Sequence, residues 1–225
     1  MTTGYLGPVE HPKSGQPETT KGQSHYFSTQ SDARSKRSRI RLDLPDLSVD
    51  LMTDRGVFSP DRVDPGTKLL LGELPVLPDG PLLDLGCGYG PIAVTLARRR
   101  PGQLIWAVDV SERAMELAQI NLAANAPQGT PFEVGDPDLV PTDMSFAAIV
   151  SNPPIRVGKT VLHDMLDRWL PRLSPDSSAW LVVHRHLGAD SLTTWLQGRG
   201  HVVERIRSRQ GYRILKVTPG GPASG

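Results

Sequence analysis

The sequence predicts an α/β protein built around a doubly wound, mostly parallel β-sheet. Three observations lead to this prediction. From residue 81 onward, short apolar segments alternate with helical segments, an order typical of parallel sheets covered by helices. A glycine-rich loop joins the first apolar segment to the first helix of this series. The last two apolar segments are joined by a short turn near residues 210–211, so we expect an antiparallel strand at that edge.

The segment before this pattern has two different parts. Residues 1–24 are rich in Gly, Pro, Ser and Thr, and we expect a disordered leader there. Apolar residues then alternate with polar ones on both sides of Pro45-Asp46, which predicts a β-hairpin within an N-terminal extension over 25–60. Both Ser59 and Asp64 precede a proline, as N-cap residues do, and they predict a helix ending near Leu74.

The alternating part predicts seven strands and four further helices. Ser111 and Asp190 are the expected N-caps of the second and fourth of these helices. We expect one domain over 25–218 and a flexible tail over 219–225. The predicted strands cover 81–85, 104–108, 132–134, 147–150, 179–183, 201–206 and 212–217, and the helices cover 91–100, 112–125, 161–170 and 191–197.

Composition sets outer limits on function. The chain has 225 residues, 38% of them hydrophobic, and a formal net charge of +1, which neither requires nor excludes a nucleic-acid partner. A single cysteine rules out an intrachain disulfide framework. No secretory signal and no apolar run of membrane-spanning length is present. We therefore expect a cytoplasmic protein without membrane contact, and its oligomeric state stays open.

The glycine-rich loop predicts a site for an adenosine cofactor. Residues 82–91 read LLDLGCGYGP, and Gly86, Gly88 and Gly90 allow a tight turn and close approach of a ligand. Asp109 ends the next strand, where a carboxylate can accept protons of both ribose hydroxyls. Cys87, a small residue within the loop, and Val110, beside Asp109, complete the candidate contacts.

Two details favour S-adenosylmethionine over a dinucleotide. Pro91 stands at the position where G-x-G-x-x-G requires its third glycine. Asp84 precedes the loop, where a carboxylate can order the backbone or meet an ammonium group but would repel a pyrophosphate. Asp136 follows the third strand and is placed to reach the adenine amine.

The fourth strand ends in Asn152-Pro153-Pro154-Ile155, the candidate catalytic segment. Ligands of open α/β sheets bind at the carboxyl ends of strands, and a residue before proline is restricted to extended conformations. The Asn152 side-chain carbonyl and the Pro153 backbone carbonyl can therefore accept the two N–H bonds of an exocyclic amine. Asn152 would also lie beside the cofactor.

Other side chains are candidates for substrate binding. Phe58 can pack over the cofactor or a target base, or belong to the core, while Arg156 and Lys159 follow the catalytic segment and can hold RNA phosphates. His, Asp and Glu show no metal-ligand spacing, so no metal is expected. A basic cluster is formed by Arg34, Lys36, Arg37, Arg39 and Arg41. This cluster can contact phosphates, or it can be an ordinary solvated surface.

With these motifs the chain resembles the class I S-adenosylmethionine-dependent methyltransferases with a "methyltransferase small" domain, which have a Rossmann-like sheet. It is similar in particular to a single-domain branch related to the bacterial 16S rRNA guanine-N2 methyltransferases. Besides 84–90, Asp109 and 152–154, the segments 25–28, 53–59, 61–67, 155–159 with His163, and 211–212 carry this resemblance, which runs from about His25 to Val217.

The resemblance implies methylation of a small-subunit rRNA guanine at its exocyclic amine. The chain departs from the family in two respects: longer members carry an additional N-terminal half, and Ile155 stands where amino-methylating relatives commonly have Phe or Tyr. Other amine targets therefore stay open, namely adenine N6, a protein glutamine side chain, or a small molecule. A non-catalytic module that binds the cofactor is the alternative from another class.

Overall fold

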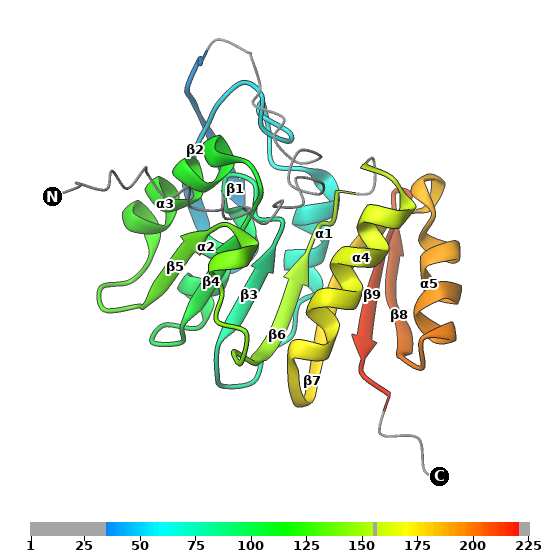
Figure 1. The fold of residues 1–225 in the computed structure, drawn as a ribbon. Helices are drawn as coiled ribbons and strands as arrows, with labels where there is room; N and C mark the ends of the chain where they lie inside the picture. Colours follow the sequence, from blue (N-terminus) through cyan, green and yellow to red (C-terminus); the bar gives the residue numbers. More distant parts are fainter. Residues whose placement is uncertain (1–34, 155–156, 221–225) are drawn as a thin grey trace, which may run out of the picture.

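The fold is a single seven-stranded sheet with helices on both faces and a small hairpin beside it (Figure 1). A computed structural model describes residues 35–154 and 157–220 of the chain. The strands are arranged in the order β5 (Phe132–Gly135), β4 (Ile105–Val108), β3 (Leu82–Leu85), β6 (Phe146–Ser151), β7 (Leu173–His184), β9 (Tyr212–Thr218) and β8 (Val202–Arg209). The doubly wound, mostly parallel sheet predicted from the sequence is confirmed.

Only β9 runs against the other strands of this sheet. It is the antiparallel strand expected at this end, and it lies one place in from the edge, between β7 and β8. Gln210 and Gly211 join it to β8 with φ angles of 49° and 84°. Two consecutive positive φ values are typical of a type I′ turn, whose twist matches that of the flanking strands.

Two apolar cores lie on the two faces of the sheet. Helices α1 (Pro65–Glu73), α2 (Pro91–Arg99) and α3 (Glu112–Asn125) share one core with the predicted hairpin, formed by β1 (Ser38–Asp43) and β2 (Ser48–Thr53). Helices α4 (Lys159–Trp169) and α5 (Ala189–Gly198) share the other. Strands β3, β4 and β6 are buried along their whole length, because helices cover them on both sides. Within the described ranges, no helix is long and apolar enough to cross a membrane.

Two of the four predicted N-caps are wrong. Asp64 and Ser111 accept bonds from the backbone N–H groups of Thr67 and Ala114, as predicted. Ser59 instead has a φ of 51° and donates its hydroxyl hydrogen to the Arg62 carbonyl, so it forms a turn before the helix. Asp190 lies inside α5, whose N-cap is Gly188, and its carboxylate pairs with arginines of β8 and β9.

Candidate active site

The candidate site lies where β4, β3 and β6 end side by side. After β3 the chain adds β4 and then β5 on one side of that strand. It then crosses back and adds β6 and β7 on the other side, so the order of the strands reverses at β3. Such a reversal opens a crevice at the carboxyl edge of the sheet. It brings together the glycine loop after β3, Asp109 after β4 and Asn152 after β6.

Backbone hydrogen bonds hold the glycine loop against β4. The N–H groups of Gly86 and Cys87 both donate to the Val108 carbonyl at 2.9 Å, and the N–H of Gly88 donates to Asp109 Oδ2 at 2.9 Å. Gly90 has a φ of 83°, and a Cβ there would lie 3.2 Å from the Ala118 backbone. The loop therefore needs glycine here, both for its conformation and for its close approach to α3.

Asp109 is oriented but still accessible. Its Oδ1 accepts from the N–H of Ser111 at 3.0 Å, while its Oδ2 accepts the Gly88 bond, and the residue is half-buried. Each carboxylate oxygen keeps acceptor capacity, which suits two ribose hydroxyls. Two exposed apolar side chains follow the ends of β4 and β5, namely Val110, 47% exposed, and Leu139, 69% exposed. Such side chains suit the faces of an adenine ring, and Leu139 lies in none of the sequence motifs that indicate the site.

Asp84 is fully buried and only half satisfied. Its Oδ2 accepts from the N–H of Ala93 at 2.9 Å, which orders the first turn of α2. Its Oδ1 has no hydrogen-bond partner among the described residues. Burial, with the nearby charge of Asp109 as a smaller cause, raises the pKa of Asp84 to about 8. An ammonium group placed at Oδ1 would satisfy it, so the residues present fit the methionine end of S-adenosylmethionine.

Cys87 and Asp136 have local structural roles in the same region. Cys87 is buried, and burial raises the pKa of its thiol well above the usual value, which makes it a poor nucleophile. Asp136 Oδ1 accepts from the N–H of Asp138 at 2.8 Å and thereby holds the short turn Pro137–Leu139 after β5. Asp136 is half-buried and stays a candidate contact for an adenine amine.

The Asn152 side chain has one defined orientation. Its Nδ2 donates to Asp64 Oδ1 at 3.0 Å and to Thr67 Oγ1 at 2.9 Å, so both amide hydrogens are in use. A flipped amide would place its carbonyl oxygen against the Asp64 carboxylate, which is repulsive. The Asn152 carbonyl is therefore the atom that can accept a bond from a substrate. Pro153 is buried beside it, whereas Pro154 is exposed and lies 3.7 Å from the position of a Cβ on Gly86.

The acceptor that orients Asn152 was missed in the sequence analysis, which assigned Asp64 only a capping role. Its Oδ1 accepts from Thr67 N at 3.1 Å as well as from Asn152, and its Oδ2 accepts from the Tyr212 hydroxyl at 3.3 Å. Gly66 lets the Tyr212 ring approach, since a Cβ there would lie 2.5 Å from the ring. The sequence did contain a signal for Asp64 and Tyr212, because the segments 61–67 and 211–212 carry the family resemblance although no role follows from it for these two residues.

Two of the candidate substrate-binding residues, Phe58 and Lys159, lie within the part of the chain that the structure describes. Phe58 is 60% exposed, so of its two possible roles the core position is excluded. Lys159 is exposed at the first turn of α4. Ile155 and Arg156 lie outside the described residues.

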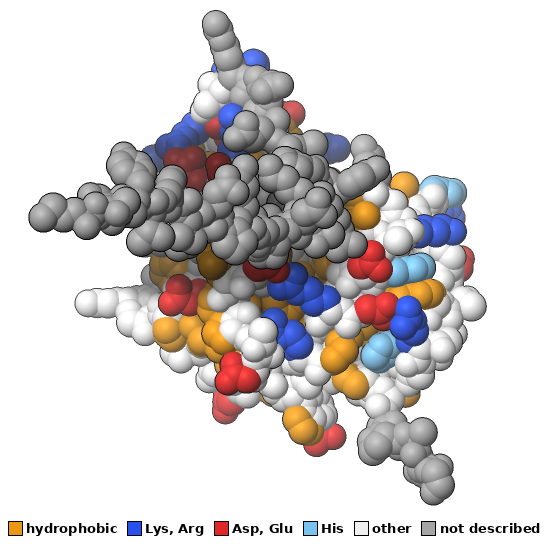
Figure 2. Space-filling view, viewed as in Figure 1, with side chains coloured by type: hydrophobic (Ala, Val, Ile, Leu, Met, Phe, Trp, Pro, Cys, Tyr) orange, Lys and Arg blue, Asp and Glu red, His pale blue; other side chains and the backbone are white. Residues whose placement is uncertain are grey.

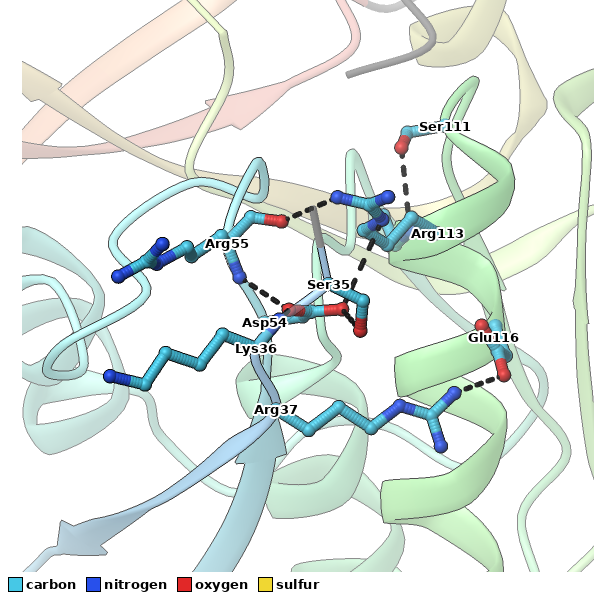
Figure 3. Close-up of polar contacts among 9 residues, drawn as sticks. Ser35, Lys36, Arg37, Asp54, Arg55, Ser111, Arg113 and Glu116 are labelled. Carbon is cyan, nitrogen blue, oxygen red and sulfur yellow. Dashed lines mark hydrogen bonds and ion pairs between the residues drawn. The ribbon is translucent and has the colours of Figure 1, made fainter. Parts of the chain in front are cut away.

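A polar cluster ties the N-terminal hairpin to α3, the helix that begins just after Asp109 (Figure 3). At its centre is the buried Asp54, which accepts from Ser35 Oγ at 2.6 Å and from the N–H groups of Lys36 and Arg55 at 2.5 and 2.7 Å. From α3, the Arg113 guanidinium donates to the Arg55 carbonyl at 2.7 Å. Part of the predicted basic cluster is neutralised by acidic partners, namely Glu116 for Arg37, and Asp43 and Asp50 for Arg41.

Fold and site together define an S-adenosylmethionine-dependent methyltransferase. The glycine loop, the accessible carboxylate of Asp109 and the half-satisfied buried carboxylate of Asp84 lie together at the carboxyl edge of the sheet, where this class binds its cofactor. The chain belongs to the methyltransferase small domain family, whose model matches residues 48–216.

Relatives of this chain differ in length. It is 34% identical to the uncharacterized protein YbxB of Bacillus subtilis, over 86% of this chain and 97% of that protein. It is 40% identical to ribosomal RNA small subunit methyltransferase C of Pseudomonas putida, over 83% of this chain and 56% of the relative. The chain thus spans about half the length of its ribosomal RNA methyltransferase relatives.

A similar solved structure is that of the T. thermophilus 16S rRNA N2 G1207 methyltransferase in complex with AdoMet and guanosine. It matches with a TM-score of 0.68 and 24% identity, over 83% of this chain and 51% of that one. This likeness concerns the fold.

Proposed function

We propose that this protein methylates the exocyclic N2 amine of a guanine in 16S rRNA. The observation that carries the proposal is the orientation of Asn152, whose amide hydrogens bond to Asp64 and Thr67 and whose carbonyl is left to accept. Relatives named ribosomal RNA small subunit methyltransferase C support the choice of RNA. A ribosomal RNA substrate would place the enzyme in the cytoplasm.

In this proposal the protein positions the amine. S-adenosylmethionine, when bound, supplies an electrophilic methyl group. The Asn152 Oδ1 and the Pro153 carbonyl accept the two N–H bonds of the target amine and turn its lone pair toward that methyl group. A C–N bond then forms as the C–S bond breaks, and the nitrogen loses a proton to water. Position and oriented dipoles, rather than a strong base, account for the rate.

Asp84, Asp109 and Asp136 would hold the ammonium, ribose and adenine groups of the cofactor, with Gly86, Gly88, Gly90, Cys87 and Val110 forming the walls of its site. Phe58, Arg156 and Lys159 would contact the RNA. The cofactor assignments rest on position at the carboxyl edge of the sheet and on the geometry described above, whereas those of Phe58, Arg156 and Lys159 rest on the sequence.

The test uses radiolabelled S-adenosylmethionine with undermethylated small ribosomal subunits, free 16S rRNA and total cell protein. We expect label in N2-methylguanosine and a loss of turnover of about 100-fold or more in Asn152→Ala. The matched control is Asn125→Ala. Asn125 is the last residue of α3, at the end of that helix away from Asp109, and its side chain donates to the Asp50 carbonyl.

Three results would contradict the proposal. Full turnover by Asn152→Ala would remove its central residue. Label in methyladenosine, in protein glutamine or in a small molecule would replace the substrate. Cofactor binding without methyl transfer to any of these would indicate a binding module.

A further inference from the structure

A basic groove lies at the tip of the β8–β9 hairpin, at the same edge of the sheet as the candidate active site. β9 is antiparallel to β7, so the turn that precedes β9 lies at the carboxyl end of β7. The cavity here has a volume of about 340 Å3. We call it the basic groove, and it is lined by Arg185, Arg205, Ser208, Arg209, Gln210, Gly211, Tyr212 and Arg213.

The groove carries an excess of positive charge. Arg205 and Arg213 share one carboxylate, that of Asp190. Arg185 and Arg209 have no acidic partner among the residues that the structure describes. Figure 2 shows histidine together with lysine or arginine side chains at the upper right of the molecule, beside the upper end of α5. One carboxylate against four guanidinium groups leaves a surface that attracts anions.

The guanidinium groups are held on an ordered frame. The N–H of Arg185 donates to the Gly211 carbonyl at 2.7 Å, and its Nε donates to His186 Nε2 at 3.0 Å. Gly211 fits closely under His184, whose Nε2 would lie 2.7 Å from a Cβ at that position. Because the type I′ turn and the end of β7 are bonded together, the groove does not depend on a loose loop for its shape.

Tyr212 links the groove to the catalytic segment. It lines the groove, and its hydroxyl donates to Asp64, the acceptor that orients Asn152. Its ring also meets the His184 ring edge to face, with centroids 4.9 Å apart. The groove is therefore joined through two hydrogen bonds to the side chain of Asn152.

We propose that the basic groove binds phosphates of the RNA strand next to the methylated nucleotide. The proposal rests on the proposed function, because it assumes an RNA substrate. Arg185 and Arg209 are the primary phosphate contacts, since no carboxylate of the described residues pairs with them. Arginine suits this role because its planar guanidinium can donate two hydrogen bonds to one phosphate. Asp190 holds Arg205 and Arg213 in place at the wall of the groove.

The test compares Arg185→Gln/Arg209→Gln with Arg207→Gln as the matched control. Arg207 lies on β8, as Arg209 does, but it pairs with Glu73 of α1 at 3.3 Å and does not line the groove. Binding of 16S rRNA and of a mixed-sequence single-stranded RNA oligonucleotide is measured at several salt concentrations. Unfolding temperature and S-adenosylmethionine affinity are measured for each variant, so that a folding defect is recognised.

We expect the double variant to bind both RNAs about tenfold more weakly, and its salt dependence to be shallower by about 1.4 in the slope of log K against log salt, since each lost phosphate contact on a single strand accounts for about 0.7. Arg207→Gln is expected to keep the wild-type slope. Equal slopes for the double variant and the wild type would overturn the inference, even if the wild type methylates RNA.

Other outcomes separate the two proposals. If the wild type neither binds nor methylates RNA, the proposed function fails and the inference fails with it. If the wild type binds poly-glutamate through Arg185 and Arg209 and binds no RNA, the groove takes an acidic polypeptide and the inference is overturned.

Discussion

Replacing Asp64 by serine tests whether this carboxylate positions Asn152. Asp64 serves α1 as N-cap and also accepts from Asn152 and Tyr212. Serine is about as good an N-cap as aspartate, but its hydroxyl is too short to keep the other two bonds. The variant therefore separates the capping role from the positioning role.

The structure allows a rough estimate of both effects. A lost cap costs about 1 kcal/mol, and Asp64→Ser largely keeps it. The lost bonds to a charged acceptor are each worth about 1.5–3 kcal/mol when buried, and less here because Asp64 and Asn152 are only half-buried. We expect the free energy of unfolding to fall by about 1 kcal/mol. Without Asp64 the Asn152 amide keeps only its bond to Thr67 Oγ1, and a displacement of its carbonyl oxygen by about 1 Å corresponds to a loss of about 100-fold in kcat.

The assay combines urea unfolding, S-adenosylmethionine binding by calorimetry, and kcat and KM for methyl transfer. Asp64→Asn serves as the rescue, because asparagine caps helices equally well and keeps a carbonyl oxygen for the Asn152 amide. We expect Asp64→Asn to recover most of kcat, with cofactor affinity unchanged in both variants. A folded Asp64→Ser protein with the wild-type kcat would refute the positioning role. A loss that Asp64→Asn does not relieve would also refute it.

Two further predictions concern the walls of the site. Folded Asp84 stays protonated up to about pH 8, whereas the unfolded chain ionises it near 3.8. The folded state thus binds more protons between these values, and this group lowers the free energy of unfolding as pH rises, by up to about 1.4 kcal/mol per pH unit. Asp84→Asn should lack this slope, and urea unfolding curves whose difference is constant with pH would contradict it. Gly66→Ala would bring a Cβ within 2.5 Å of the Tyr212 ring, whereas Gly72→Ala in the same helix meets no atom of the described residues within 4 Å. We expect the free energy of unfolding to fall by about 1–3 kcal/mol in Gly66→Ala and to rise by about 0.5–1 kcal/mol in Gly72→Ala. Equal unfolding midpoints of the two variants would show that the Tyr212 ring does not need the space.

Sequence pattern alone predicted the sheet, its helices and the glycine loop of the candidate site. Strand–helix alternation and the glycine loop are local signals, since the period of apolar residues and the positive φ of three glycines depend on near neighbours. Asp109 and Asn152 could be placed for the same reason, because each ends a predicted strand and parallel strands end at one edge. Ser59 fails as a cap for a local reason, because its φ of 51° lies outside the extended range of an N-cap residue, and the helix begins after Asp64 instead.

Only the tertiary structure decided how Asn152 is oriented and what lies beside it. Asp64 and Asn152 are 88 positions apart, and Asp64 and Tyr212 are 148 apart. No periodicity connects residues at such separations. They meet because α1 packs against the sheet near β9 and because Gly66 leaves room for the Tyr212 ring. The basic groove has the same origin. Its arginines come from the end of β7 and from both strands of the hairpin, and the antiparallel insertion of β9 brings them to the catalytic edge.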